Sequence, residues 1–318
     1  MRLIRFISLL VLLLAWSTSL HAQSQTPDAA LRYYNDAERK VNKGDWAAAV
    51  EDYTRAIELS SHLVSPANAL YHSVNGFVES ESQVEANRIR VVDPFTARAY
   101  ANRSFAFYHQ KNFDRAISDG DQALRINPGL AAAYLNRGAA RRAKGDLTGA
   151  MADFDRALSI DPNLFEAYNN RGALRHDLGD VDGALLDLNR AIALNDALPE
   201  AYFHRGYVLL AKKDYEAAIA DFDRSIELRP TLASAYQGRG TCLMDKLDFP
   251  RAISDFNRAL ELNPSLDGAC MNRGLIMVLL GRDAEAQKDF DRCLALSPER
   301  KDELLHRIQL ARELRAKP

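Results

Sequence analysis

Histidine and cysteine are the side chains best suited to bind metals or act as nucleophiles, and here they form no known catalytic or metal-binding pattern. The chain has seven histidines and three cysteines. It contains no Cys-x-x-Cys, His-Glu-x-x-His, Gly-x-Ser-x-Gly or Gly-x-x-x-x-Gly-Lys sequence. These patterns would supply a redox pair, zinc ligands, a serine nucleophile and a phosphate loop, respectively. We therefore predict a protein that is not an enzyme and that uses no metal or cofactor.

The overall composition excludes further classes of protein. The 318 residues include 41 basic and 43 acidic side chains, which gives a net charge of −2. Such a chain has no general attraction for nucleic acid or for an anionic membrane. Its hydrophobic content of 47% and charged content of 26% are ordinary for a folded chain.

The amino terminus has the composition of an export signal. Two arginines precede an uncharged apolar run of eleven residues, from Phe6 to Trp16, and small or polar residues follow as far as Ala22. A helix that spans a bilayer needs about 20 apolar residues, so this run is short for a permanent anchor. We predict a signal peptide over residues 1–22, export to the bacterial periplasm, and no stable membrane insertion after cleavage. An uncleaved amino-terminal anchor is the alternative.

A period of 34 residues organises the rest of the chain. Proline recurs at this spacing, or at twice this spacing, at Pro94, Pro128, Pro162, Pro230, Pro264 and Pro298. Units that begin at residues 97, 131, 165, 199, 233 and 267 align without a gap, and a unit that begins at residue 30 fits the same frame. Each unit reads as two amphipathic helices. A turn such as Gly145-Asp146 separates them, because glycine ends one helix and aspartate caps the next.

The repeated columns resemble the tetratricopeptide repeat (TPR) family. In the unit of residues 131–164 these columns are Tyr134, Gly138, Ala150, Phe154, Ala157 and Pro162. The resemblance implies an all-α fold, a right-handed α-solenoid of about eight antiparallel helix pairs with a C-terminal capping helix. We assign one unit to residues 30–63, six units to residues 97–300 and the capping helix to residues 301–316. Residues 64–96 are either a degenerate unit or an insertion.

Arginine and aspartate recur at fixed positions and are expected to form structural ion pairs. Arginine occupies the seventh position of six units, and aspartate occupies the twenty-third position of seven. The two positions lie side by side in an antiparallel hairpin. The central expected pairs are Arg137 with Asp153, Arg171 with Asp187, and Arg205 with Asp221. In the first unit Asp36 replaces the arginine, so Asp52 is expected to pair with Arg55 or Arg39.

The exposed side of the first helices is the predicted partner-binding surface. In the TPR family, positions two, five, six, nine, twelve and thirteen line a concave groove. The candidates at these positions are Tyr34, Asn102, Phe105, Tyr108, His109, Leu135, Asn136, Arg142, Asn169, Asn170, His176, Phe203 and Tyr207. Aromatic residues supply binding energy, and an asparagine amide can pair with a peptide backbone. Packing within the solenoid is the alternative for both groups. No unit has lysine at position five, so a clamp for a peptide carboxylate is not expected.

The last unit has a different character. Cys270 and Cys293 are expected to face each other in one hairpin, where an oxidising compartment would allow a disulfide. Met271, Leu275 and Val278 make this end of the groove apolar. That composition predicts either self-association or burial under the terminal helix.

These features favour a non-catalytic protein-interaction scaffold or adaptor in the cell envelope. Its partners would be other proteins or peptides, and not nucleic acid. A glycan-binding protein that uses the groove aromatics is one alternative. An enzyme that uses residues 64–96 is the other, although His72, Glu79, Glu81 and Glu85 have no spacing that implies a mechanism.

Overall fold

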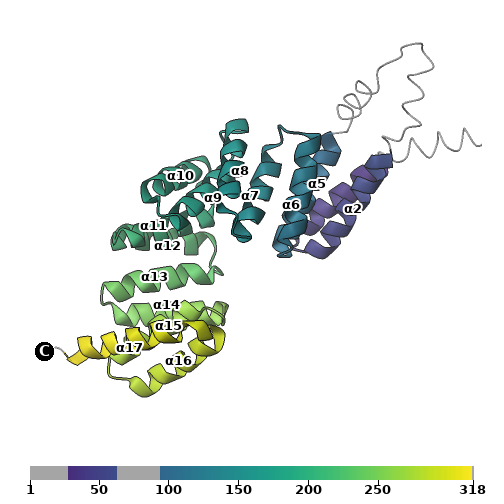
Figure 1. The fold of residues 1–318 in the computed structure, drawn as a ribbon. Helices are drawn as coiled ribbons and strands as arrows, with labels where there is room; N and C mark the ends of the chain where they lie inside the picture. Colours follow the sequence, from purple (N-terminus) through teal and green to yellow (C-terminus); the bar gives the residue numbers. More distant parts are fainter. Residues whose placement is uncertain (1–27, 63–93, 317–318) are drawn as a thin grey trace, which may run out of the picture. The chain divides into compact units, whose positions relative to one another are not determined.

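A computed structural model describes residues 28–62 and 94–316, and this part of the chain is built from helices without a strand. The predicted signal peptide over residues 1–22 lies outside the described residues. The described helices divide into two compact units, with the boundary between Leu164 and Phe165 (Figure 1).

Each unit is a stack of antiparallel helix pairs that follow the 34-residue period. The first unit contains a helix over residues 28–42, α2 (Trp46–His62), α5 (Pro94–His109), α6 (Phe113–Ile126), α7 (Ala131–Ala143) and α8 (Leu147–Ile160). The second contains α9 (Phe165–Asp177), α10 (Val181–Leu194), α11 (Pro199–Ala211), α12 (Tyr215–Leu228), α13 (Ala233–Asp245), α14 (Phe249–Leu262), α15 (Asp267–Leu279), α16 (Asp283–Leu296), the 3₁₀ turn η1 (Pro298–Arg300) and α17 (Lys301–Ala316). The expected TPR architecture is therefore present in both units.

The central turn of each pair forms as its sequence predicts. Gly145 has φ +85°, a left-handed conformation that glycine adopts without steric cost. Asp146 then caps α8, because its side chain accepts a hydrogen bond from the Gly149 amide. Where another residue takes the place of this glycine, its backbone adopts the same left-handed conformation. Leu247, for example, has φ 63°.

Replacing Leu247 with glycine should raise the free energy of unfolding by about 1 kcal/mol, because a left-handed L-residue costs roughly 1–2 kcal/mol. The Leu247 side chain contributes little packing, since 72% of it is exposed. Urea unfolding followed by circular dichroism would measure the gain. Leu247→Ala is the matched control, since it removes the same side chain and keeps the strain. Equal stability of the two variants would contradict the explanation.

Small residues of the first helices pack against aromatic residues of the second helices. A Cβ atom on Gly138 would lie 2.8 Å from Cε1 of Phe154, a ring with no exposed surface. Gly240 meets Phe256 in the same way, at 2.9 Å. The small and aromatic columns of the repeat are therefore two sides of one close contact.

The repeats on either side of residues 63–93 pack directly against each other. Helix α2 packs directly against α5, as α6 packs against α7. The hydroxyl of Thr96 donates to that of Ser60 (2.9 Å), and the rings of Tyr34 and Phe95 lie 5.1 Å apart. The units of residues 30–63 and 97–130 are thus neighbours; the choice between an insertion and a degenerate unit for residues 64–96 stays open, because residues 63–93 lie outside the described residues. Helix α5 also begins at Pro94, three residues before the expected start, because proline is favoured in a first helical turn.

Candidate partner-binding surface

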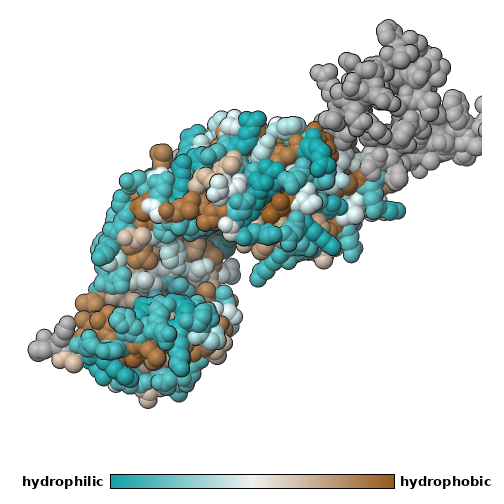
Figure 2. All heavy atoms as spheres, in the orientation of Figure 1, coloured by the Kyte–Doolittle hydropathy of each residue, from teal (hydrophilic) through white to brown (hydrophobic). Residues whose placement is uncertain are grey.

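We use "first-helix face" for the exposed side of the first helix of each pair, at positions two, five, six, nine, twelve and thirteen of the repeat. On the side of the molecule that Figure 2 shows, areas of hydrophobic residues lie among hydrophilic ones. Whether this face can bind a partner depends on which of its side chains already form hydrogen bonds, ion pairs or packing contacts within the fold.

The arginine and aspartate columns are used within the fold, as predicted. Arg205 donates from Nε and Nη2 to both carboxylate oxygens of Asp221, each at 2.7 Å. The same two-pronged contact joins Arg103 to Asp119, Arg137 to Asp153, Arg171 to Asp187, Arg239 to Asp255 and Arg273 to Asp289. The aspartates are buried, so these bonds are the strong, charge-assisted kind.

Five of these arginines also join their repeat to the preceding one in a way that the sequence period does not reveal; they are Arg103, Arg137, Arg205, Arg239 and Arg273. The remaining nitrogen, Nη1, reaches position 25 of the preceding repeat, as Arg137 does with Asp121 (2.6 Å) and Arg239 with Asp223 (2.6 Å). The Arg205 guanidinium also lies 5.6 Å from the ring centre of Tyr202, one turn earlier. These contacts stabilise the stack and leave the arginines unavailable as a row of cations for an anionic polymer.

The first repeat departs from the expected pairing. Asp52 pairs with Lys40 at 2.6 Å, whereas Arg39 pairs with Asp36 and Arg55 with Glu58. The prediction of Arg55 or Arg39 as the partner was wrong. With aspartate at position seven, the nearest cation to Asp52 comes from one turn further along the first helix.

The asparagines at position six mainly tie one first helix to the preceding one. Asn102 donates through Nδ2 to the Tyr34 hydroxyl (2.9 Å) and to Glu38 (2.6 Å). Asn136 donates to the Ala101 carbonyl at 2.9 Å. The amide N–H groups of Asn102 and Asn136 are therefore bonded to the preceding first helix. This is the packing role that was the alternative to peptide binding.

Aromatic candidates of the first unit gather around a residue that the sequence analysis did not select. The Trp46 ring stacks on His109 at 4.1 Å with an angle of 10°, and Phe105 meets His109 edge-on at 4.4 Å. Tyr108 also contacts His109, at 5.4 Å. Phe105 is 36% exposed, and burial against these rings lowers the pKa of His109. The cluster is a partly exposed aromatic platform.

The other candidates of the first unit are either packed against aromatic rings or half-buried. Tyr34 packs on Tyr53 and Phe95, and burial raises the pKa of its hydroxyl. Leu135 and Arg142 are half-buried on α7. Of the predicted candidates in this unit, Phe105 and His109 are the exposed ones.

In the second unit, Tyr207 is half-buried and packs against the apolar core. Its ring lies 5.2 Å from that of Phe222, and burial raises the pKa of its hydroxyl to about 12. Phe203 and His176 are half-buried, whereas Asn169 is only 6% exposed. Nδ2 of Asn169 donates to Oδ1 of Asn170 at 3.4 Å.

The predicted cysteine pair is brought together as two free, buried thiols. Both sulfurs donate to the Asp267 carbonyl, Cys270 at 3.1 Å and Cys293 at 3.5 Å. Burial raises the pKa of Cys270 to about 12, which disfavours the reactive thiolate. The disulfide stays a prediction, and alkylation without reductant followed by mass measurement would test it.

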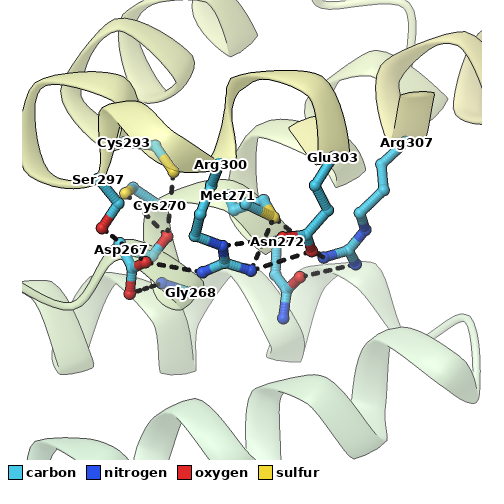
Figure 3. Close-up of polar contacts among 10 residues, drawn as sticks. All are labelled: Asp267, Gly268, Cys270, Met271, Asn272, Cys293, Ser297, Arg300, Glu303 and Arg307. Carbon is cyan, nitrogen blue, oxygen red and sulfur yellow. Dashed lines mark hydrogen bonds and ion pairs between the residues drawn. The ribbon is translucent and has the colours of Figure 1, made fainter. Parts of the chain in front are cut away.

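The terminal helix covers the last part of the first-helix face (Figure 3). Arg300 donates to Asp267 at 2.7 Å, and Arg307 donates to Oδ1 of Asn272 at 3.1 Å and to the Met271 sulfur at 3.0 Å. Met271 is fully buried, and Leu275 and Val278 are nearly so. Of the two readings of this apolar end, burial under the terminal helix is confirmed.

Two further features of the described residues bear on function. In residues 28–62 and 94–316, no group of three or more histidine, cysteine, aspartate or glutamate side chains could hold a metal ion. No helix in these same ranges is both long enough and apolar enough to cross a membrane.

Comparison with known families identifies the fold. Profiles described as "tetratricopeptide repeat" match residues 97–130, 199–232 and 268–300, and one described as "TPR repeat" matches residues 138–179 and 174–213. The chain belongs to the tetratricopeptide repeat family. Residues 233–267 of this TPR protein lie between matched segments, and α13 and α14 occupy them, so the repeat continues there.

Solved structures agree on the fold of this TPR protein. A tetratricopeptide repeat protein from Parabacteroides merdae is 18% identical with a TM-score of 0.57, and the match covers 89% of this chain and 99% of that one. PilF from Pseudomonas aeruginosa is 18% identical with a TM-score of 0.56, over 64% and 92% of the two chains. TTC0263 from Thermus thermophilus is 18% identical with a TM-score of 0.50, over 68% and 100%. No curated protein matches the chain.

Proposed function

We propose that this TPR protein is a non-catalytic scaffold that binds segments of partner proteins on its first-helix face. The observation that carries the proposal is that some repeat positions hold side chains paired within the fold, whereas others hold exposed side chains. The arginines and aspartates are paired inside the fold, whereas Phe105 and His109, at positions nine and thirteen, keep exposed surface. Exposed aromatic side chains are typical of protein-binding surfaces.

The proposed place of action is the cell envelope, after removal of residues 1–22. The basic start and the short apolar run support this proposal. Expression of the full chain followed by fractionation and mass measurement would test it. A periplasmic product that begins at Gln23 supports export, and a full-length product in the cytosol contradicts it.

Crosslinking and capture from an envelope extract would test the binding function. The wild type should retain specific proteins, and Phe105→Ala with His109→Ala should retain less of those that use the platform. The matched control is Arg115→Ala on α6, an exposed change in the second-helix layer. Recovery of sugar polymer without protein would favour the glycan-binding alternative and overturn the scaffold.

Trp46 provides an independent reading in solution. It is the one tryptophan left after removal of residues 1–22, and it stacks directly on His109. A partner that contacts the platform should therefore change its emission. An unchanged spectrum with a partner retained through Phe105 would contradict binding at this place.

A further inference from the structure

The terminal helix lies on the side of α15 that is accessible on the first helix before it. Met271, Leu275 and Val278 occupy positions five, nine and twelve of the last repeat, and all three are buried. The residues at the same positions of α13 are only half-buried; they are Gln237, Thr241 and Met244. Helix α17 therefore covers a part of the first-helix face.

Helix α17 is not the first helix of a further repeat. Helices α7, α11, α13 and α15 each pack against the second helix that precedes them, whereas α17 packs along the first helix α15. Positions 17 and 21 hold large apolar or aromatic side chains in the five repeats before the last, as Phe249 and Ile253 do. The last repeat has Asp283 and Gln287 there. The stack of repeats thus ends at α16, and α17 lies on α15 as a bound segment of a partner would.

Two kinds of contact hold α17 on this face. One side of the helix has an aliphatic stripe that packs into the core of the last repeat; it consists of Leu304, Ile308 and Ala311. Arginines beside the stripe donate to acceptors of α15: Arg307 to Oδ1 of Asn272 at 3.1 Å (Figure 3), and Arg315 to the Val278 carbonyl at 2.9 Å. The ligand that fits this face is therefore an amphipathic helix with a narrow aliphatic stripe and flanking arginines.

The contact that holds α17 in place is small. Only Leu304 and Ala311 of this helix are buried. Arg307 is partly desolvated, yet its acceptors on α15 are an uncharged amide and a sulfur, and the carboxylate of Glu303 lies 3.8 Å away. Burial therefore lowers the pKa of Arg307, because its surroundings do not fully compensate the charge. A helix with few buried contacts opens more readily than the helices of the core.

We propose that the first-helix face of α15 is a binding site for an amphipathic helix of a partner protein, and that α17 closes this site in the free protein. The partner helix carries an aliphatic stripe and arginines, as α17 does, and displaces α17 when it binds. The inference rests on the proposed scaffold function and adds the chemistry of one partner and the way its site is closed. Because α17 is joined to α16, its effective concentration at the site is high, and binding of a separate helix is weakened.

A synthetic peptide with the sequence of residues 297–316 and a fluorophore at its amino end is the probe. Fluorescence anisotropy would measure its binding to the full mature chain, which should be weak because α17 occupies the site. The full-length Leu304→Ala variant should bind the peptide at least about tenfold more tightly, because more of its molecules have an open site. Leu305→Ala is the matched control, since Leu305 is 52% exposed, and it should behave as the wild type.

A second variant opens the site without a change in the apolar core. Replacing both Arg312 and Arg315 with alanine removes the ion pairs that the end of α17 makes with Asp283. Peptide binding should become about twofold to fivefold tighter, since such pairs contribute little each. Circular dichroism checks that this variant and Leu304→Ala both fold.

Two matched peptides and a crosslink would locate the binding. Leu304→Ala with Ile308→Ala in the peptide should weaken binding at least about tenfold, whereas Leu305→Ala with Leu310→Ala should not. A photoreactive leucine at position 304 of the probe should label α15. Equal affinity of the wild-type and Leu304→Ala chains, equal binding of the two peptides, labelling elsewhere or no binding would each overturn this inference. Capture from the envelope extract decides the scaffold function separately.

Discussion

Replacing Arg205 with alanine should lower the free energy of unfolding by about 3–5 kcal/mol, because it leaves a buried carboxylate without its cation. Asp221 is only 5% exposed, and both of its oxygens accept from Arg205 at 2.7 Å. Asp221→Ala should cost less, since the longer Arg205 side chain can turn toward solvent. Urea unfolding of the two variants, followed by circular dichroism, would measure the difference.

The double variant distinguishes pairing from packing. Arg205→Met combined with Asp221→Leu should be more stable than Arg205→Ala alone, because no unpaired charge remains. A double variant no better than the single one would contradict the ion-pair account. Arg171 and Asp187 would test it less cleanly, since Arg175 also donates to Asp187, at 2.8 Å, and would partly replace the missing arginine.

The loss at Arg205 should also spread beyond one helix pair. Its Nη1 donates to Asn189 of the preceding repeat at 2.7 Å, so the variant weakens the contact between α10 and α11 as well. In a solenoid, stability depends on such contacts between neighbours. Hydrogen exchange should therefore increase in α10 as well as in α11 and α12.

Contacts that recur with the period could be predicted from the sequence. The columns of Arg205 and Asp221 identified a real pair, because the separation of 16 residues closes the hairpin in six repeats. The small column at Gly138 likewise identified its contact with Phe154. A repeated spacing carries its own geometry, since each unit must satisfy the same neighbours.

Contacts made once per chain could not be predicted in this way. Residues 64–96, between α2 and α5 in the sequence, have few of the characteristic residues of the repeat. Only the structure therefore shows that α2 packs directly on α5. The roles of the asparagines were left open, because one amide suits both a peptide and a neighbouring helix. Trp46 was missed because its partner His109 lies in another repeat.

Replacing Leu304 with alanine should lower the free energy of unfolding by about 2–5 kcal/mol and loosen the terminal helix. Leu304 is 1% exposed and belongs to the same apolar core as Met271, Leu275 and Cys293. The polar contacts of α17 cannot compensate, because Arg312 and Arg315 pair with the exposed Asp283, and surface ion pairs contribute about 0–1 kcal/mol each. Leu304 and Ala311 are the buried residues of α17, so loss of the larger Leu304 side chain should weaken the contact of this helix with α15.

The next residue provides the matched control for this prediction. Leu305 is 52% exposed, so Leu305→Ala should change stability by no more than about 0.5 kcal/mol. Deleting residues 301–318 should go further than Leu304→Ala, because it uncovers Met271, Leu275 and Val278 together. Sedimentation should then show self-association, since a solenoid that loses its cap presents apolar surface to other copies. A truncated chain that stays monomeric and as stable as the wild type would show that α17 does not act as a cap.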